Sequence, residues 1–77
     1  MRDKILSILK GIRPEFDFEG SDDFVEDGYL DSFDVIELIS CIEKELGVVI
    51  DGLDILPDNF KNLDAIVTTI KRNGGTE

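Results

Sequence analysis

Residues 28–39 read Gly-Tyr-Leu-Asp-Ser-Phe-Asp-Val-Ile-Glu-Leu-Ile and are the most informative stretch of the chain. From Ser32 onward the apolar residues recur with helical spacing, which predicts a helix from about Ser32 to Leu46. Gly47 stands where a glycine commonly ends a helix. We expect the Ser32 hydroxyl to be exposed beside the free N–H groups of the helix start, a favourable place for a phosphate group. Alternatively, Asp31 and Ser32 only cap the helix, because both residue types are preferred there.

Two further segments outside this stretch have helical periodicity. The first carries Ile5, Ile8, Leu9 and Ile12 on one face and is expected to stop near Arg13, because Pro14 disfavours helical geometry in the residue before it. The other runs from about Leu63 to Arg72, with Asn62 as the predicted N-cap.

The connections between the three helices also contain apolar residues. The long first loop, Arg13 to Leu30, carries residues that we expect to anchor it on the bundle: Phe16, Phe18, Phe24, Tyr29 and Leu30. After the central helix, residues 48–50 predict an extended packed segment, and Pro57 predicts a short helical turn through Phe60. The sequence thus predicts an all-α bundle of three main helices plus one short helix, forming a single domain over residues 1–73 with a flexible tail at 74–77.

The net charge of the chain limits the classes of partner that it can bind. Its 77 residues include 18 acidic and 8 basic side chains, a formal net charge of −10. Nucleic acid and anionic membrane surfaces would be repelled, whereas a protein with a basic patch would be attracted. No run of 18 apolar residues predicts a membrane span, and no signal peptide is recognisable, so we expect a cytoplasmic protein.

The residue types present argue against catalysis by the chain itself. It has no His and a single Cys, Cys41, so the usual base of a hydrolytic triad and any internal disulfide are missing. We expect Cys41 to be buried and structural. Acidic residues in the first loop (Asp22, Asp23, Glu26 and Asp27) lack the spacing of a calcium-binding loop, so we predict no metal site. A metal protein and an unmodified acidic interaction module stay as alternatives.

The sequence Asp31-Ser32-Phe33-Asp34-Val35-Ile36-Glu37-Leu38 resembles the Asp-Ser-Leu motif and following helix of acyl carrier proteins. The resemblance extends over most of the chain and implies that a phosphopantetheinyl transferase attaches 4'-phosphopantetheine, taken from coenzyme A, to Ser32. It implies that Asp31 assists beside a magnesium ion bound by the transferase. Six residues of the same helix are then expected to bind partner enzymes that present basic docking patches: Phe33, Asp34, Ile36, Glu37, Ser40 and Glu43.

The cargo is less well defined by this resemblance. Phe33 replaces the common leucine, and residues 28–33 look closer to stand-alone D-alanyl carriers, yet the tryptophan characteristic of that group is absent. We therefore expect a stand-alone, monomeric acyl carrier, of the kind that serves fatty acid biosynthesis. An aminoacyl or peptidyl carrier loaded by an adenylate-forming ligase is the alternative.

Overall fold

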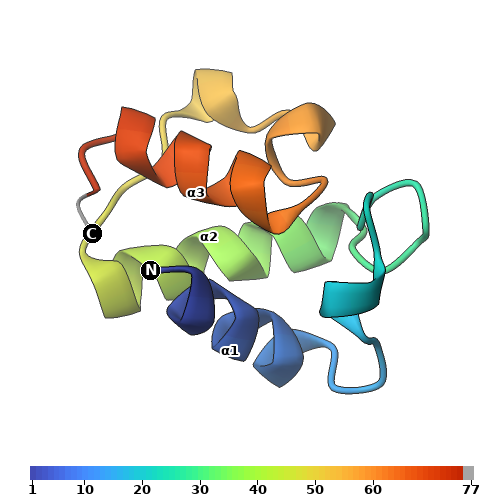
Figure 1. Cartoon of the computed structure of the whole chain (residues 1–77). Helices are drawn as coiled ribbons and strands as arrows, with labels where there is room; N and C mark the ends of the chain where they lie inside the picture. Colours follow the sequence, from blue (N-terminus) through green and yellow to red (C-terminus); the bar gives the residue numbers. More distant parts are fainter. Residues whose placement is uncertain (76–77) are drawn as a thin grey trace.

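The elements described here are those of residues 1–75 in a computed structural model of the chain. Three α-helices and three short 3₁₀ turns follow one another in the order α1 (Arg2–Ile12), η1 (Phe18–Gly20), α2 (Ser32–Leu46), η2 (Gly52–Asp54), η3 (Pro57–Asn59) and α3 (Leu63–Arg72). No strand occurs within these residues. The predicted all-α bundle with a long first loop is confirmed (Figure 1). The predicted short helix at Pro57 corresponds to η3, whereas η1 and η2 were not expected.

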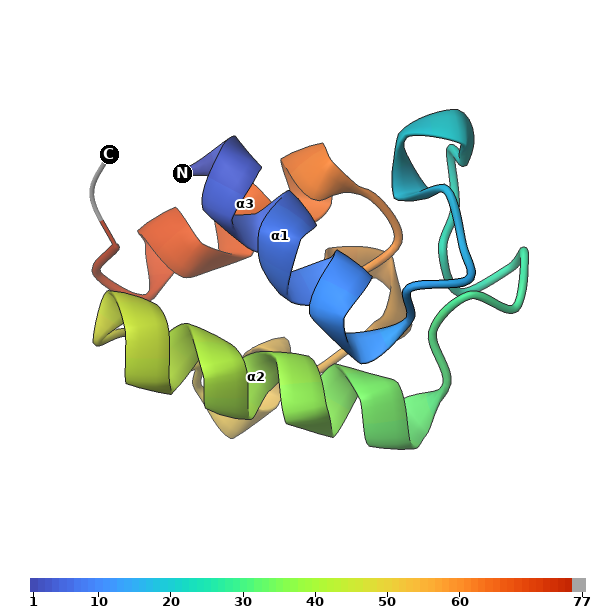
Figure 2. The ribbon, with the colours of Figure 1, turned by 90° about the horizontal axis from the view of Figure 1, so that it is seen from below.

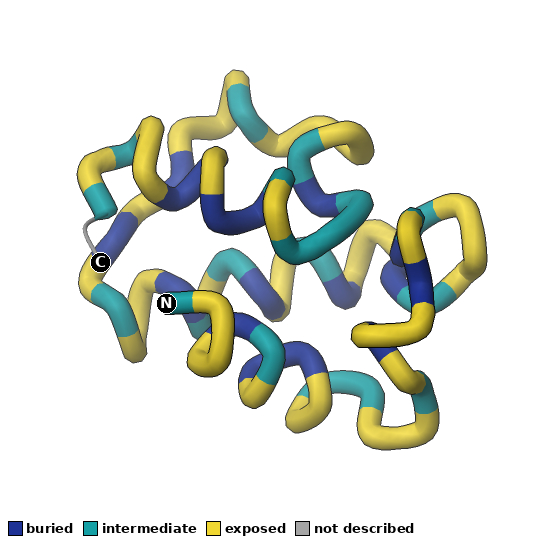
Figure 3. The backbone as a smooth tube through the Cα atoms, viewed as in Figure 1, coloured by how far each residue is buried: buried dark blue, intermediate teal, exposed yellow. Residues whose placement is uncertain are grey.

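The core lies between the three α-helices, because each helix turns its apolar stripe inward. α1 packs against both α2 and α3. Figure 2 shows α1 crossing over α2 so that its carboxyl end lies toward the start of α2. The inner sides of all three helices are buried and their outer sides exposed (Figure 3). Seven helical residues are central to this core: Ile5, Ile8, Leu9, Leu38, Ile42, Ile66 and Ile70.

The helix ends follow from local sequence. Gly47 ends α2 in the left-handed conformation, with φ of 70°, which costs glycine little because it has no Cβ. The Asn62 side chain accepts a hydrogen bond from the Ala65 N–H and caps α3. α1 ends at Ile12, directly before Arg13 and Pro14. These three predicted boundaries are confirmed.

The long first loop is held by a cluster of aromatic rings. Phe16 stacks on Tyr29 with ring centroids 4.4 Å apart, and Phe18 meets Phe24 edge-on at 5.0 Å. The backbone oxygen of Phe24 accepts hydrogen bonds from the N–H groups of Tyr29 and Leu30. The loop is thereby fixed to the core just before the start of α2, as the anchor prediction requires.

The expectation about Cys41 is modified by the structure. Cys41 is only partly buried, since it lies at the edge of the core where α1 and α2 meet. After α2, Val48 and Ile50 are buried while Val49 is exposed, and residues 48–50 form no strand, so the predicted packed segment is confirmed. Within the predicted tail, the Gly75 N–H donates to the Ile70 oxygen. Residues 76–77 lie outside the described part of the chain, so the tail remains a prediction.

Candidate functional site

Ser32 is the first residue of α2, and a capping box holds the helix start around it. The Asp31 carboxylate accepts a hydrogen bond from the Asp34 N–H at 2.9 Å, and the Asp34 carboxylate accepts one from the Asp31 N–H at 3.1 Å. Asp31 is therefore the cap. Ser32 is exposed, and its hydroxyl has no hydrogen-bond partner among residues 1–75. The hydroxyl is free for another role.

Asp34 does not lie on the exposed face of α2, contrary to its predicted place among the partner-binding residues. It is 6 % exposed and is bound by Arg13, whose Nε donates to Asp34 Oδ2 at 3.0 Å. Helical spacing places position 34 at the inner side of the first turn, and Arg13 supplies the opposite charge that a buried carboxylate requires. Asp34 is thus a structural group that joins α1 to α2.

The pKa of Asp34 reflects this environment. Burial acts to raise the pKa, but hydrogen bonds from Arg13 and from the Asp31 N–H, together with the positive charge of Arg13, hold it below the ordinary value of 3.8. A lowered carboxyl pKa contributes stability that is fully present above the unfolded-state pKa and is lost as the pH falls through the folded-state pKa.

We therefore expect Asp34→Asn to be less stable than the wild type at pH 7, with the difference shrinking as the pH is lowered from about 4 to 2. The other carboxyl groups titrate in both proteins and cancel in the comparison. Urea unfolding at pH 7, 4 and 2.5 measures the two free energies of unfolding. A difference that stays constant across this range would contradict the assignment.

The remaining predicted partner-binding residues do lie on the outer face of α2. Phe33 is 81 % exposed and Ile36 is 58 % exposed. Glu37, Ser40 and Glu43 continue the same face along the helix and are exposed as well. Two apolar side chains next to Ser32, followed by acidic and polar ones, therefore form a surface that we call the outer face of α2.

An apolar hollow of about 250 Å³ opens directly beside Ser32. Asp31 and Ser32 contribute to its wall from the start of α2, and the rest of the lining is apolar: Val25, Leu30, Val35, Ile36, Ile55, Leu56 and Pro57. This hollow could not be predicted from the sequence, because its lining comes from the first loop, α2 and the η2–η3 segment. The only signal was the apolar run Ile55-Leu56-Pro57 within a polar connection.

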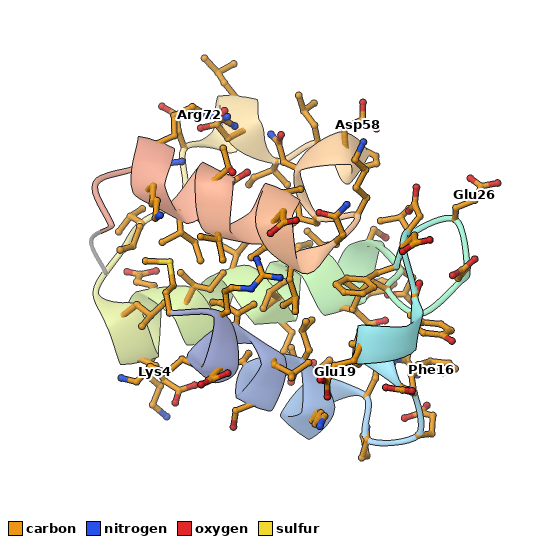
Figure 4. The ribbon with its side chains drawn as sticks, in the orientation of Figure 1. Lys4, Phe16, Glu19, Glu26, Asp58 and Arg72 are labelled. Carbon is orange, nitrogen blue, oxygen red and sulfur yellow. The ribbon has the colours of Figure 1, made fainter. Side chains whose placement is uncertain are left out.

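Two acidic residues of the first loop, Asp23 and Asp27, make hydrogen bonds within the loop. The Asp23 carboxylate accepts hydrogen bonds from the N–H groups of Val25 and Glu26, and Asp27 accepts one from the Ser21 hydroxyl. Figure 4 shows Glu26 directed away from the bundle. No group of three potential metal ligands gathers anywhere in residues 1–75. Nor does this part of the chain contain a helix with the length and apolarity needed to traverse a bilayer.

A comparison with known protein families agrees with the geometry found around Ser32. The family model described as the phosphopantetheine attachment site matches residues 2–70, which is nearly the whole chain. The chain therefore belongs to the phosphopantetheine-binding family of acyl carrier proteins. It is a carrier protein for covalently attached 4'-phosphopantetheine. A search of curated proteins found no match to it.

The start of α2 fits such an attachment. A phosphodiester needs a hydroxyl that is exposed and not already bonded, and Ser32 meets both conditions. The neighbouring N–H groups and the positive end of the helix dipole favour the negative charge of the phosphate. When attached, the arm supplies a terminal thiol that holds cargo as a thioester.

Proposed function

We propose that Ser32 is the attachment residue and that the chain is an acyl carrier which delivers thioester-bound acyl groups to partner enzymes. The single observation that carries the proposal is the exposed, unbonded Ser32 hydroxyl, which lies next to the Asp31–Asp34 capping box on a residue that lines an apolar hollow. The chain itself is non-catalytic in this proposal and is the substrate of a phosphopantetheinyl transferase. We keep the cytoplasm as the expected compartment.

The hollow supports acyl over aminoacyl cargo. Its lining can remove an apolar acyl chain from water, and each methylene buried there contributes roughly 0.8 kcal/mol of favourable free energy. An aminoacyl group carries an ammonium, for which this lining has no partner except the Asp31 carboxylate at one end. A fatty acyl chain therefore suits the hollow better, which supports a role in fatty acid or related acyl metabolism.

The outer face of α2 supports the delivery role. It presents Phe33 and Ile36 near the attachment residue and Glu37 and Glu43 farther along. Acidic side chains steer the chain toward basic patches on partner enzymes, while exposed apolar ones contribute contact area on docking. Weak, fast encounters suit a carrier that visits several enzymes, because the tethered cargo then has a high effective concentration at each active site.

The direct test is intact mass after incubation with coenzyme A, magnesium and a broad-specificity phosphopantetheinyl transferase. We expect one added phosphopantetheine unit, located at Ser32 by peptide fragmentation. A folded chain that gains no mass would overturn the proposal and would favour the unmodified interaction module.

Cargo is tested next by comparing the octanoyl and alanyl thioesters of the modified chain. If the octanoyl group enters the hollow, it should raise the thermal unfolding midpoint by about 4 to 8 °C for each kcal/mol gained, whereas the alanyl group should leave the midpoint nearly unchanged. Equal midpoints for the two thioesters would remove the argument for acyl cargo.

A further inference from the structure

Arg13 joins the end of α1 to the start of α2. It directly follows α1 in the chain, yet its guanidinium lies against the capping box of α2. Nη2 lies 2.9 Å from Asp34 Oδ2 and 3.5 Å from Asp31 Oδ2, in addition to the hydrogen bond that Nε donates to Asp34. One basic side chain therefore contacts both carboxylates next to Ser32.

These contacts restrict the orientation of the Asp31 carboxylate. Its Oδ1 accepts the capping hydrogen bond from the Asp34 N–H, and its Oδ2 faces Arg13. The Asp31 side chain is nevertheless 58 % exposed, so it stays accessible from solvent. An exposed aspartate without such partners would sample several rotamers, and its restriction here places one carboxylate in a set direction beside the Ser32 hydroxyl.

Arg13 also changes the charge that an incoming phosphate group meets. Asp31 and Asp34 together place two negative charges around the first turn of α2, in a chain whose net charge is already −10. The diphosphate of coenzyme A is an anion and must approach Ser32 at this turn. Like charges brought together at an interface oppose association, and the guanidinium offsets part of this repulsion.

We propose that Arg13 is a positioning residue for the modification of Ser32: it sets the direction of the Asp31 carboxylate and reduces the negative charge around the Ser32 hydroxyl. This inference rests on the proposed function. In the reaction the Ser32 Oγ–phosphorus bond forms while the P–O bond within the coenzyme A diphosphate breaks. Adenosine 3',5'-bisphosphate leaves, and the hydroxyl proton passes to a base on the transferase.

The test compares Arg13→Gln, Arg13→Lys and Arg72→Gln as substrates of the transferase with coenzyme A and magnesium. Arg72→Gln is the matched control, because Arg72 also pairs with an aspartate, Asp54, but lies at the opposite end of the bundle from the start of α2 (Figure 4). For each variant, kcat and the KM for the carrier are measured, together with urea unfolding.

We expect Arg13→Gln to lower kcat about tenfold or more, as misplacement of reacting groups typically does. Arg13→Lys should be intermediate, because lysine keeps the charge but cannot contact both carboxylates with a planar fork. Arg72→Gln should match the wild type. Partial unfolding of a variant would reduce the amount of folded carrier and so raise its apparent KM without lowering kcat, which separates the positioning role from a structural one.

Two results would overturn the inference while leaving the proposed function intact. One is a kcat for Arg13→Gln within twofold of the wild type. The other is an equal loss of kcat in Arg72→Gln, which would show a general effect of net charge. Failure of the wild type itself to gain mass would instead overturn both proposals together.

Discussion

Ser32→Ala is expected to abolish the addition of phosphopantetheine completely while the chain keeps its fold. The loss should be complete because, among residues 1–75, only the Ser32 hydroxyl combines exposure with a place beside the capping box and the apolar hollow. The fold should persist because the hydroxyl makes no hydrogen bond among residues 1–75 and the cap belongs to Asp31. We expect the free energy of unfolding to change by no more than about 0.5 kcal/mol.

Intact mass and urea unfolding of the same preparation measure both parts of this prediction. Ser7→Ala is the matched control, since Ser7 is an exposed serine on α1 and should leave modification unchanged. A mass gain that persists in Ser32→Ala would place the attachment at another residue. Loss of the fold in Ser32→Ala would show that Ser32 has a structural role beyond the cap that Asp31 provides.

Phe24→Ala is expected to destabilise the chain by about 3 to 5 kcal/mol. Phe24 is 1 % exposed, it contacts the ring of Phe18, and its backbone oxygen holds the N–H groups of Tyr29 and Leu30. Removing the ring leaves a cavity exactly where the loop is anchored before α2. A chain of this size has a total stability of only about 4 to 12 kcal/mol, so the variant should be partly unfolded at 37 °C.

Phe33→Ala provides the control for this experiment. The ring of Phe33 is 81 % exposed, so its removal should change the free energy of unfolding by no more than about 0.5 kcal/mol. Urea unfolding followed by circular dichroism compares the two variants with the wild type. A similar decrease in the free energy of unfolding in Phe24→Ala and Phe33→Ala would mean that the loop is not anchored through Phe24.

The structural features that depend on residues close together in the sequence could be predicted. Helical spacing placed α2 and α3 at their observed residues, and single residues marked their ends at Gly47 and Asn62. These features follow from contacts within about one helical turn, which the order of residues already contains. The exposed positions of Phe33 and Ile36 agree with the helix face that the resemblance to acyl carrier proteins implied.

The role of Asp34 could not be predicted from its own helix. An acidic residue in the first turn of a helix is favourable in itself, which favoured a partner-binding role, and local sequence does not show which base would pair with it. Arg13 lies 21 positions earlier and reaches Asp34 only because α1 packs on α2. The two short turns η1 and η2 were missed because three-residue segments carry no usable periodicity.

The sequence alone thus determined the three helices, their capped ends, and a serine at the start of the central helix in a carrier-like motif. Only the tertiary structure decided which carboxylate is buried against Arg13 and that an apolar hollow adjoins the serine. The physical reason is that helix formation depends on residues three or four positions apart, whereas a buried ion pair and a hollow depend on which distant side chains packing brings together.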